Sequence, residues 1–168
     1  MALRGFPVLA EDVVPLLEAD GKFLAVPGYP RVCLWPDSVE KLLGTEEALP
    51  RLTEAWGKRY LPLDGKLGKF AADPLPLGLI YLLAERNGQG GAPRIEAMSA
   101  REALLELVKN TYMNWLLDRG QRAIEFDVLS RLVRQVPVRR ITPHSDAKKI
   151  TALCELIAED AGKVLRGH

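Results

Sequence analysis

Two adjacent carboxylates near the N-terminus are the residues best suited to chemistry. Glu11 and Asp12 follow the apolar run FPVLA, residues 6–10. Carboxylates at the end of a buried strand can hold Mg²⁺ or accept a proton from a hydroxyl group. Because side chains alternate along a strand, we expect one of the two to face such a site while the other points elsewhere. The alternative is a solvated turn, and the pattern alone leaves it open.

A nucleotide site of the usual kind also needs a phosphate loop before this strand. The loop G-x-x-x-x-G-K-[ST] binds phosphates through its backbone N–H groups and its lysine, and its hydroxyl holds the metal. Residues 1–5 are all that precede the apolar run, and the motif occurs nowhere in the 168 residues. We therefore expect the chain alone to bind no ATP and to correspond to the second half of a kinase-like fold.

Basic side chains could supply the anion-binding part of a site. Arg31 follows the rigid turn PGYP, residues 27–30, so its guanidinium is held where it could clamp a phosphate or a carboxylate. Lys58 and Arg59 precede a segment rich in Gly, Lys and Asp, residues 64–74, and could meet a phosphorylated ligand. Each also has a simpler explanation, which is a surface ion pair for Arg31 and solvated side chains for the other two.

The remaining candidates favour structural roles. His144 lies near an expected helix start, which is typical of a polar turn residue. Cys33 and Cys154 form no C-x-x-C or His-associated pattern, so we expect buried thiols in a reducing cytoplasm. The three tryptophans are expected in the core: Trp35, Trp56 and Trp115.

The elements that must position these residues are mostly strands in the first half of the chain. Apolar or alternating runs between turn signals predict strands at residues 6–10, 13–17, 21–26, 32–35, 58–63, 77–83 and 94–97. The run 77–83 is so continuously apolar that we expect it at the centre of a sheet. Residues 64–74 are expected to form a mobile loop and residues 86–93 a hairpin tip. A short helix is predicted after Pro36, ending at Gly44.

The second half reads as helical. Ser99 and Glu102 form a capping-box pattern that predicts a helix through residue 119, stopped by Gly120. A second amphipathic helix is predicted over residues 121–135. The apolar side chains expected to face inward from it are Ile124, Val128, Leu129 and Leu132.

The C-terminal segment completes the expected architecture. Residues 138–141 can add one short strand after Pro137, and Ser145 or Asp146 caps a last helix through residue 158. The fold class is therefore α+β, with a β-rich part over residues 1–98 and a helical part over residues 99–168. The length favours a single domain, residues 1–168.

Composition excludes some classes of partner. The 23 basic and 22 acidic side chains give a formal net charge of +1, which offers no electrostatic reason to bind nucleic acid or an anionic membrane. The longest apolar stretch, residues 75–84, is about half of a membrane span. The N-terminus lacks a basic region followed by an apolar signal core. We expect a cytoplasmic protein, with neither nucleic acid nor membrane as partner.

An ordered set of motifs resembles one known family. FPVLAEDVVPL, PGYPRVCLWPDSVEKL, KRYLPLD, PLPLGLIYLL, NTYMNWLLDRG and VPVRRI follow one another over about residues 3–160. In this order they resemble the C-terminal two-thirds of HPr-serine-kinase-like proteins, the P-loop group related to phosphoenolpyruvate carboxykinase. The most specific part is PGYPR-x₃-WPD after an acidic pair on a strand. The chain departs from the family in the absent glycine-rich loop and in Glu11, where related kinases usually have Asp.

The resemblance implies a mixed kinase-like sheet and a set of site residues. The family's acidic metal and base site matches residues 9–12. Asp12 would be the catalytic base and a metal ligand, and Glu11 its metal-binding neighbour, since a glutamate can still reach Mg²⁺. Arg31 would be a catalytic clamp for phosphate or acceptor, while Lys58 and Arg59 would contact the cofactor. The cofactors would be Mg²⁺ and ATP, with catalysis resting on positioning and charge neutralisation.

Two hypotheses of function follow. If another polypeptide supplies the phosphate loop, the chain would use ATP and Mg²⁺ to phosphorylate a hydroxyl on a protein or peptide. Otherwise it would be a catalytically inactive binding or assembly module that keeps the fold's surface. A strand that normally sits beside the phosphate-loop strand would lack its neighbour, so we expect residues 6–10, or an adjacent edge, to pair with a partner chain or a second copy.

Overall fold

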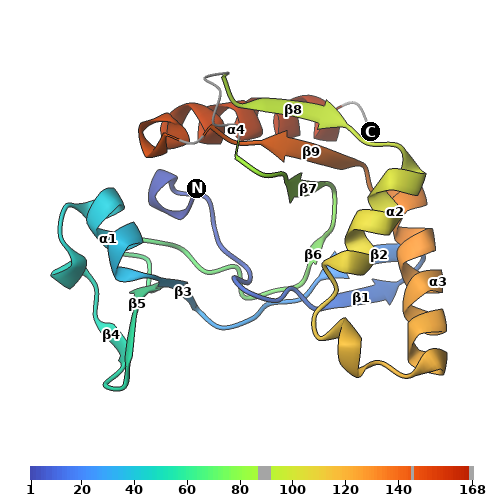
Figure 1. Ribbon diagram of the computed structural model, residues 1–168, viewed down its shortest axis with the longest axis horizontal. Coiled ribbons are helices and arrows are strands. Elements are labelled where there is room, and N and C mark those ends of the chain that lie inside the picture. Colours follow the sequence, from blue (N-terminus) through green and yellow to red (C-terminus); the bar gives the residue numbers. More distant parts are fainter. Residues whose placement is uncertain (87–91, 145, 167–168) are drawn as a thin grey trace. The chain divides into compact units, whose positions relative to one another are not determined.

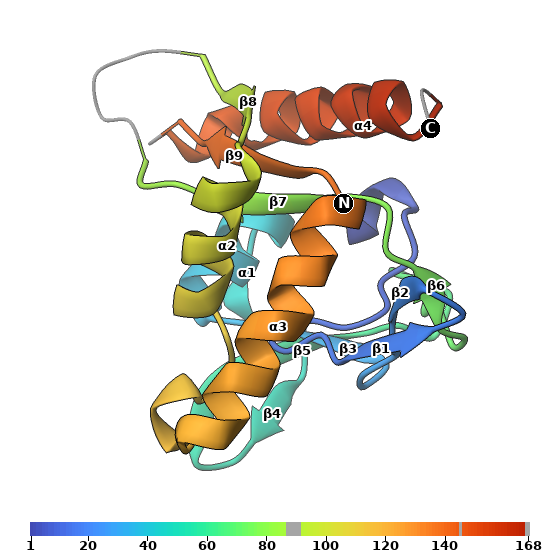
Figure 2. The same ribbon diagram turned by 90° about the vertical axis from the view of Figure 1, so that its right-hand side faces the viewer.

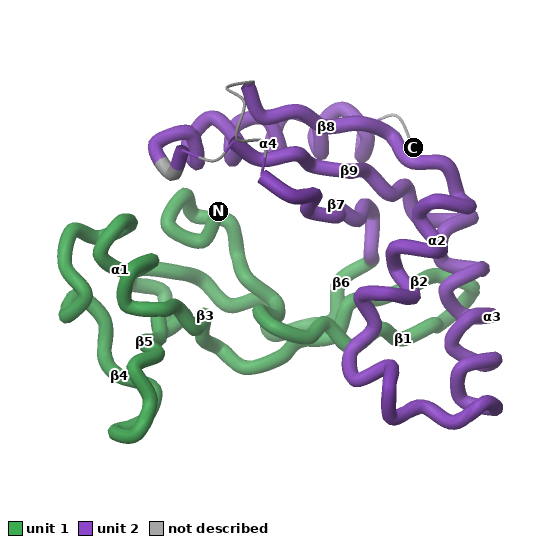
Figure 3. Tube along the Cα trace, in the orientation of Figure 1, with its two compact units in different colours: residues 1–76 green, residues 77–168 purple. Residues whose placement is uncertain are grey.

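The computed structural model describes residues 1–86, 92–144 and 146–166. The chain divides into two compact units, Met1–Pro76 and Leu77–His168 (Figure 3). The mixture of helices and strands that the sequence predicts is confirmed. The boundary between the units follows residue 76, whereas the predicted boundary between the β-rich and helical parts followed residue 98. The difference arises because two of the predicted strands pair with a strand of the C-terminal segment.

The first unit contains a small antiparallel sheet in the order β1-β2-β6 (Figure 1). Strands β1 (Leu16–Ala19) and β2 (Lys22–Ala25) form a hairpin, and β6 (Leu75–Pro76) adds the third strand. Asp20 and Gly21 join the hairpin with φ of 51° and 71°, the positive values that a tight Asp-Gly turn requires. The strand predicted over residues 13–17 begins only at Leu16.

A second sheet of this unit carries most of the predicted site. It has the order β3-β5-β4, with β3 (Arg31–Leu34), β5 (Trp56–Pro62) and β4 (Arg51–Thr53) antiparallel. Helix α1 (Pro36–Leu43) ends at Gly44, whose φ of 89° closes the helix as predicted. One face of the sheet packs on the unit's core, which comprises Val39, Leu49 and Leu61.

The predicted buried strand at residues 6–10 is wrong. After the single turn η1 (Ala2–Arg4), only Val8 makes an isolated parallel bridge, to Phe70. The Val8 N–H donates to the Lys69 carbonyl at 2.8 Å, and the Val8 carbonyl accepts from the Ala71 N–H at 2.9 Å. Among the described residues no ladder continues on either side of this bridge, so the run stays half-exposed coil.

The second unit is built on the sheet β7-β9-β8. Strand β7 (Ile80–Leu83) pairs in parallel with β9 (Val138–Thr142), and β8 (Arg94–Ala97) pairs antiparallel with it. The prediction that residues 77–83 form a central strand is wrong, because β7 has a single partner and β9 lies at the centre. A hairpin between β7 and β8 is also excluded, and residues 87–91 at its expected tip lie outside the described residues.

Two helices lie side by side in this unit (Figures 1 and 2). Helix α2 (Ala100–Lys109) begins with the predicted capping box, and α3 (Arg119–Gln135) follows the turn η3 (Asn114–Leu116). The prediction that the first helix runs to residue 119 and stops at Gly120 is wrong. Asp118 and Gln121 form a second capping box, with bonds of 2.8 and 2.9 Å, so Gly120 lies in the first turn of α3.

Burial in the helices differs from the prediction at the first half of α3. Leu129 and Leu132 are buried and Val128 is half-buried, as expected, but Ile124 is 68% exposed. The tryptophans expected in the core are also largely exposed: Trp35 at 60%, Trp56 at 61% and Trp115 at 68%. The prediction that these rings lie in the core is therefore wrong.

The C-terminal helix α4 (Ile150–Arg166) lies along the sheet of the second unit (Figures 1 and 2). It extends beyond the predicted end at residue 158. Asp146 Oδ1 accepts from the Lys148 N–H at 2.9 Å and begins the short turn η4 (Ala147–Lys149) before α4, whereas Ser145 lies outside the described residues. Within the described ranges, no helix is long and apolar enough to cross a membrane.

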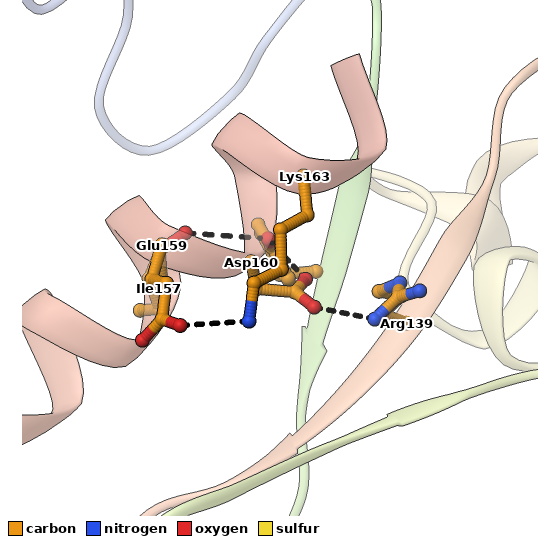
Figure 4. A network of polar contacts seen from close by, with 6 residues as sticks. Arg139, Ile157, Glu159, Asp160 and Lys163 are labelled. Atoms are coloured by element: carbon orange, nitrogen blue, oxygen red, sulfur yellow. Dashed lines mark hydrogen bonds and ion pairs between the residues drawn. The ribbon is translucent and has the colours of Figure 1, made fainter. Parts of the chain in front are cut away.

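A polar network joins α4 to two strands (Figure 4). The Tyr81 hydroxyl of β7 donates to Asp160 Oδ2 at 2.7 Å, and the Arg139 guanidinium of β9 donates to Asp160 Oδ1. Burial and the hydrogen bond to the carboxylate both raise the pKa of Tyr81 far above its ordinary value. The hydroxyl therefore stays protonated as a donor, and the network fixes the helix on the sheet.

Candidate functional site

The first unit contains a cavity of about 430 Å³ that brings together most of the predicted site. Glu11, Asp12, Arg31 and Lys58 all line it. The rest of the wall comprises Val13, Pro15, Gly28, Tyr29, Cys33, Leu52 and Trp56. We refer to this space as the charged cavity. Every one of its lining residues belongs to Met1–Pro76, so the charged cavity lies within one compact unit.

Both carboxylates line the charged cavity, although strand alternation predicted only one. Residues 11 and 12 form a bend instead of the end of a strand, and a bend does not send neighbouring side chains to opposite faces. The segment is held by the turn at Gly28, whose N–H donates to the Leu9 carbonyl at 2.9 Å. A Cβ at position 28 would lie 3.2 Å from the Ala10 Cβ, so glycine allows this close approach.

The pairing of β3 with β5 explains which basic residue reaches the cavity. Cys33 lies opposite Tyr60 and Leu34 lies opposite Arg59. Successive residues of β5 point to opposite faces of the sheet, so Lys58 faces the cavity and its neighbour Arg59 faces the core. The sequence predicts the same role for Lys58 and Arg59, but the two side chains have different surroundings.

Arg59 is placed away from the charged cavity. It is 8% exposed, and its guanidinium donates to the Leu49 carbonyl at 3.4 Å. Its Nε has no hydrogen-bond partner among the described residues. The hydrogen bond from Thr45 lowers the pKa of the nearby Glu47 carboxyl, and the charge of Arg59 also contributes to this lowering. These surroundings give no support to cofactor contact.

The four charged side chains of the cavity form no direct ion pair with one another. Among the described residues, neither Glu11, Asp12, Arg31 nor Lys58 forms an ion pair. The Arg31 guanidinium lies 5.2 Å from the centre of the Tyr29 ring, and Lys58 Nζ lies 5.2 Å from the centre of the Trp35 ring. Both signs of charge therefore remain available to a ligand.

Cys33 is a member of the site that sequence reasoning missed. Partial burial raises the pKa of its thiol, and the nearby Glu11 carboxylate raises it further by its charge and by accepting a hydrogen bond. The thiol is thus a protonated donor that contacts Glu11. Its position two residues after Arg31 in a strand was the available signal, because residues i and i+2 share a face. Neither this thiol nor Cys154 is in a disulfide.

The residues of the charged cavity fit a Mg²⁺–phosphate group better than a metal alone. No group of three or more His, Cys, Asp or Glu side chains in the described ranges is placed to hold a metal ion. Mg²⁺ is usually bound through one or two carboxylates together with substrate phosphates and water. Glu11 and Asp12 offer the carboxylates, while Arg31 and Lys58 offer charge to the phosphates.

Three further cavities lie in the second unit, and none is lined by a predicted site residue. Arg140 lines one of about 490 Å³ and His144 lines another of about 360 Å³. His144 Nδ1 accepts a hydrogen bond from the Asp146 N–H at 2.8 Å, as expected of a polar turn residue.

Comparison with known proteins adds no relative: no protein-family model, no curated protein and no solved structure matches the chain.

Proposed function

We propose that the chain is the acceptor- and metal-binding part of a kinase-like protein. Completed by a phosphate loop from another polypeptide, it would use ATP and Mg²⁺ to phosphorylate a hydroxyl on a protein or peptide. The observation that supports this proposal is the charged cavity, in which Glu11, Asp12, Arg31 and Lys58 meet without pairing with each other. Two carboxylates and two cations around one space suit a metal, a hydroxyl and phosphates together.

Each residue has a role that its surroundings support. Asp12 is exposed and without a hydrogen-bond partner in the described structure, so it is available to accept the proton of the acceptor hydroxyl. Glu11 accepts from the Cys33 thiol and would orient the metal with its remaining lone pairs. Mg²⁺, when bound, would withdraw charge from the phosphoryl oxygens. Arg31 and Lys58 would neutralise the transferred phosphoryl group.

The test is phosphate transfer by the completed protein. The polypeptide encoded immediately upstream would be co-expressed with this chain, and transfer from radiolabelled ATP to protein and peptide hydroxyls would be measured. The proposal expects transfer by the wild-type pair and its loss with Asp12→Asn. Transfer that survives Asp12→Asn contradicts the role of Asp12, and absence of transfer by a pair that contains a phosphate loop contradicts the proposed activity.

A second candidate is a catalytically inactive binding or assembly module. It is favoured by large apolar side chains of α2, α3 and the segment between them that are more than half exposed: Leu105, Tyr112, Trp115, Leu116, Ile124 and Phe126. Exposed apolar patches of this kind often mark protein contacts. The two candidates are separated by Asp12→Asn, which leaves partner binding by a module unchanged and abolishes the function of a kinase.

A further inference from the structure

The two cations of the charged cavity each lie over an aromatic ring. The Arg31 guanidinium carbon and Lys58 Nζ are both 5.2 Å from the ring centres of Tyr29 and Trp35, respectively. The rings are 75% and 60% exposed, so burial does not explain their positions. A cation at this distance from a ring face is attracted by the quadrupole of the ring.

The backbone conformation places each of the two cations beside its aromatic ring. Tyr29 and Arg31 flank Pro30, which fixes φ, and the Arg31 N–H donates to the Tyr29 carbonyl at 2.7 Å. Leu34 lies opposite Arg59 in the β3–β5 register, so the next pair in that register is Trp35 with Lys58. Residues directly opposite in an antiparallel pair have side chains on the same face, within contact distance. Each ring is thus placed beside its cation by local structure.

An aromatic ring can restrain a cation without cancelling its charge, which a carboxylate in the same place could not do. An acidic partner would hold the cation but would cancel the charge that a ligand must meet. A ring restrains the cation and leaves its full positive charge and its N–H donors available. Restraint before binding also lowers the conformational entropy lost when the ligand arrives.

We propose that Tyr29 and Trp35 are positioning residues that hold Arg31 and Lys58, two cations without a direct acidic partner, for a polyphosphate group. This inference deepens the proposed function and rests on it. The ligand class is a chain of phosphoryl groups, since two separate cations in one cavity can each meet a different phosphoryl group. The rings act through the cations and need not contact the ligand.

The experiment is a nuclear magnetic resonance titration of the chain with sodium tripolyphosphate in the presence of MgCl₂ at low ionic strength. Tyr29→Leu and Trp35→Leu should each raise the dissociation constant by roughly two- to fivefold, the range expected for an exposed cation–ring contact. Tyr29→Phe and Trp35→Phe keep a ring and should restore binding to within about twofold of the wild type. Tyr112→Leu, which removes an equally exposed ring of the second unit, is the matched control and should change nothing.

A second measurement detects the contact between each cation and its ring directly. Ring currents should shift the terminal methylene protons of Arg31 and Lys58 upfield in the wild type and in the Phe variants. The shifts should be lost in the Leu variants, which a merely stabilising role of the rings would not require. If a Leu variant does not fold, the wild-type shifts decide the question, because their absence overturns the inference.

The outcomes separate this inference from the proposed function. If Arg31→Gln and Lys58→Met weaken tripolyphosphate binding while the Leu variants do not, the rings have no positioning role and the proposed function stands. If the wild type does not bind tripolyphosphate, or if neither cation variant affects binding, both the inference and the proposed phosphate site are overturned.

Discussion

Asp12 is the residue on which the proposed chemistry depends most, and its charge should be dispensable for folding. Because its carboxylate is exposed and has no partner in the described structure, Asp12→Asn should leave the free energy of unfolding level or slightly higher, within about 0.5 kcal/mol. Denaturant unfolding of the chain measures this change. In the completed protein the same substitution should abolish transfer and spare ATP binding.

Asp64 provides the matched control for this substitution. Its Oδ1 accepts from the Lys66 N–H at 3.1 Å, which is the bond of a turn-forming aspartate. Asp64→Asn weakens that bond and should cost up to about 1 kcal/mol. If Asp12→Asn costs as much as Asp64→Asn and transfer is retained, Asp12 is a turn residue and the proposed base is wrong.

The Cys33 thiol should report on Glu11 through its pH dependence. Burial and Glu11 raise its pKa, so at a given mildly alkaline pH less thiolate is present than in an ordinary thiol. In a Cys154→Ser background, Glu11→Gln should lower the pKa and speed alkylation by iodoacetamide at pH 8. Unchanged alkylation rates would contradict the contact. A raised pKa also means that this thiol's contribution to stability is lost as pH rises above the ordinary thiol range.

At the residue scale, local pattern indicated which charged residues could share a site, and the roles proposed for them stay predictions. Glu11, Asp12, Arg31 and Lys58 were all singled out from the sequence, and the structure places them around one cavity. The opposite orientation of Arg59 followed from strand alternation and could have been predicted. The lack of ion pairs among the four charged side chains could not have been predicted. It depends on distances between segments that are far apart in the chain.

At the scale of elements, the contact of α4 with its sheet should depend on Asp160. Its side chain is 15% exposed and bonds both Tyr81 and Arg139. Asp160→Asn keeps an acceptor for the tyrosine but leaves the half-buried guanidinium without its anion, which should cost about 1 to 3 kcal/mol. Thermal or denaturant unfolding measures the loss.

The neighbouring pair on the same helix is the control (Figure 4). Glu159 and Lys163 bond at 2.7 Å, but both side chains are about two-thirds exposed, at 65% and 67%. Glu159→Gln should therefore change stability by less than about 0.5 kcal/mol. Equal costs for the two substitutions would show that the buried network does not hold the helix.

Element prediction was limited by pairing between distant segments. The apolar run at residues 77–83 predicted a central strand, yet β9 takes that position because it alone pairs on both sides. The sequence contains the capping-box residues Asp118 and Gln121. They were not recognised as a helix start, because Gly120 between them was interpreted as the end of the preceding helix. Pairing of residues 6–10 with another chain stays a prediction, since only Val8 forms a bridge within the unit.

At the scale of the whole molecule, the chain alone should bind MgATP poorly. Two cations can attract phosphates, but kinase-like folds of the proposed kind derive most nucleotide contacts from a backbone phosphate cradle, and the 168 residues contain no such motif. Calorimetry should therefore show no micromolar binding, and no phosphate should be transferred. Micromolar binding would mean that this chain contains a nucleotide site of a different kind.

The central claim is that the charged cavity binds a divalent cation together with phosphate. Mn²⁺ in the presence of tripolyphosphate tests it most directly, because the ion broadens the resonances of residues close to it. Broadening should centre on Glu11 and Asp12, extend to Arg31 and Lys58, and disappear in the double variant Glu11→Gln, Asp12→Asn. Broadening that centres on carboxylates elsewhere, or that survives the double substitution, would contradict the account.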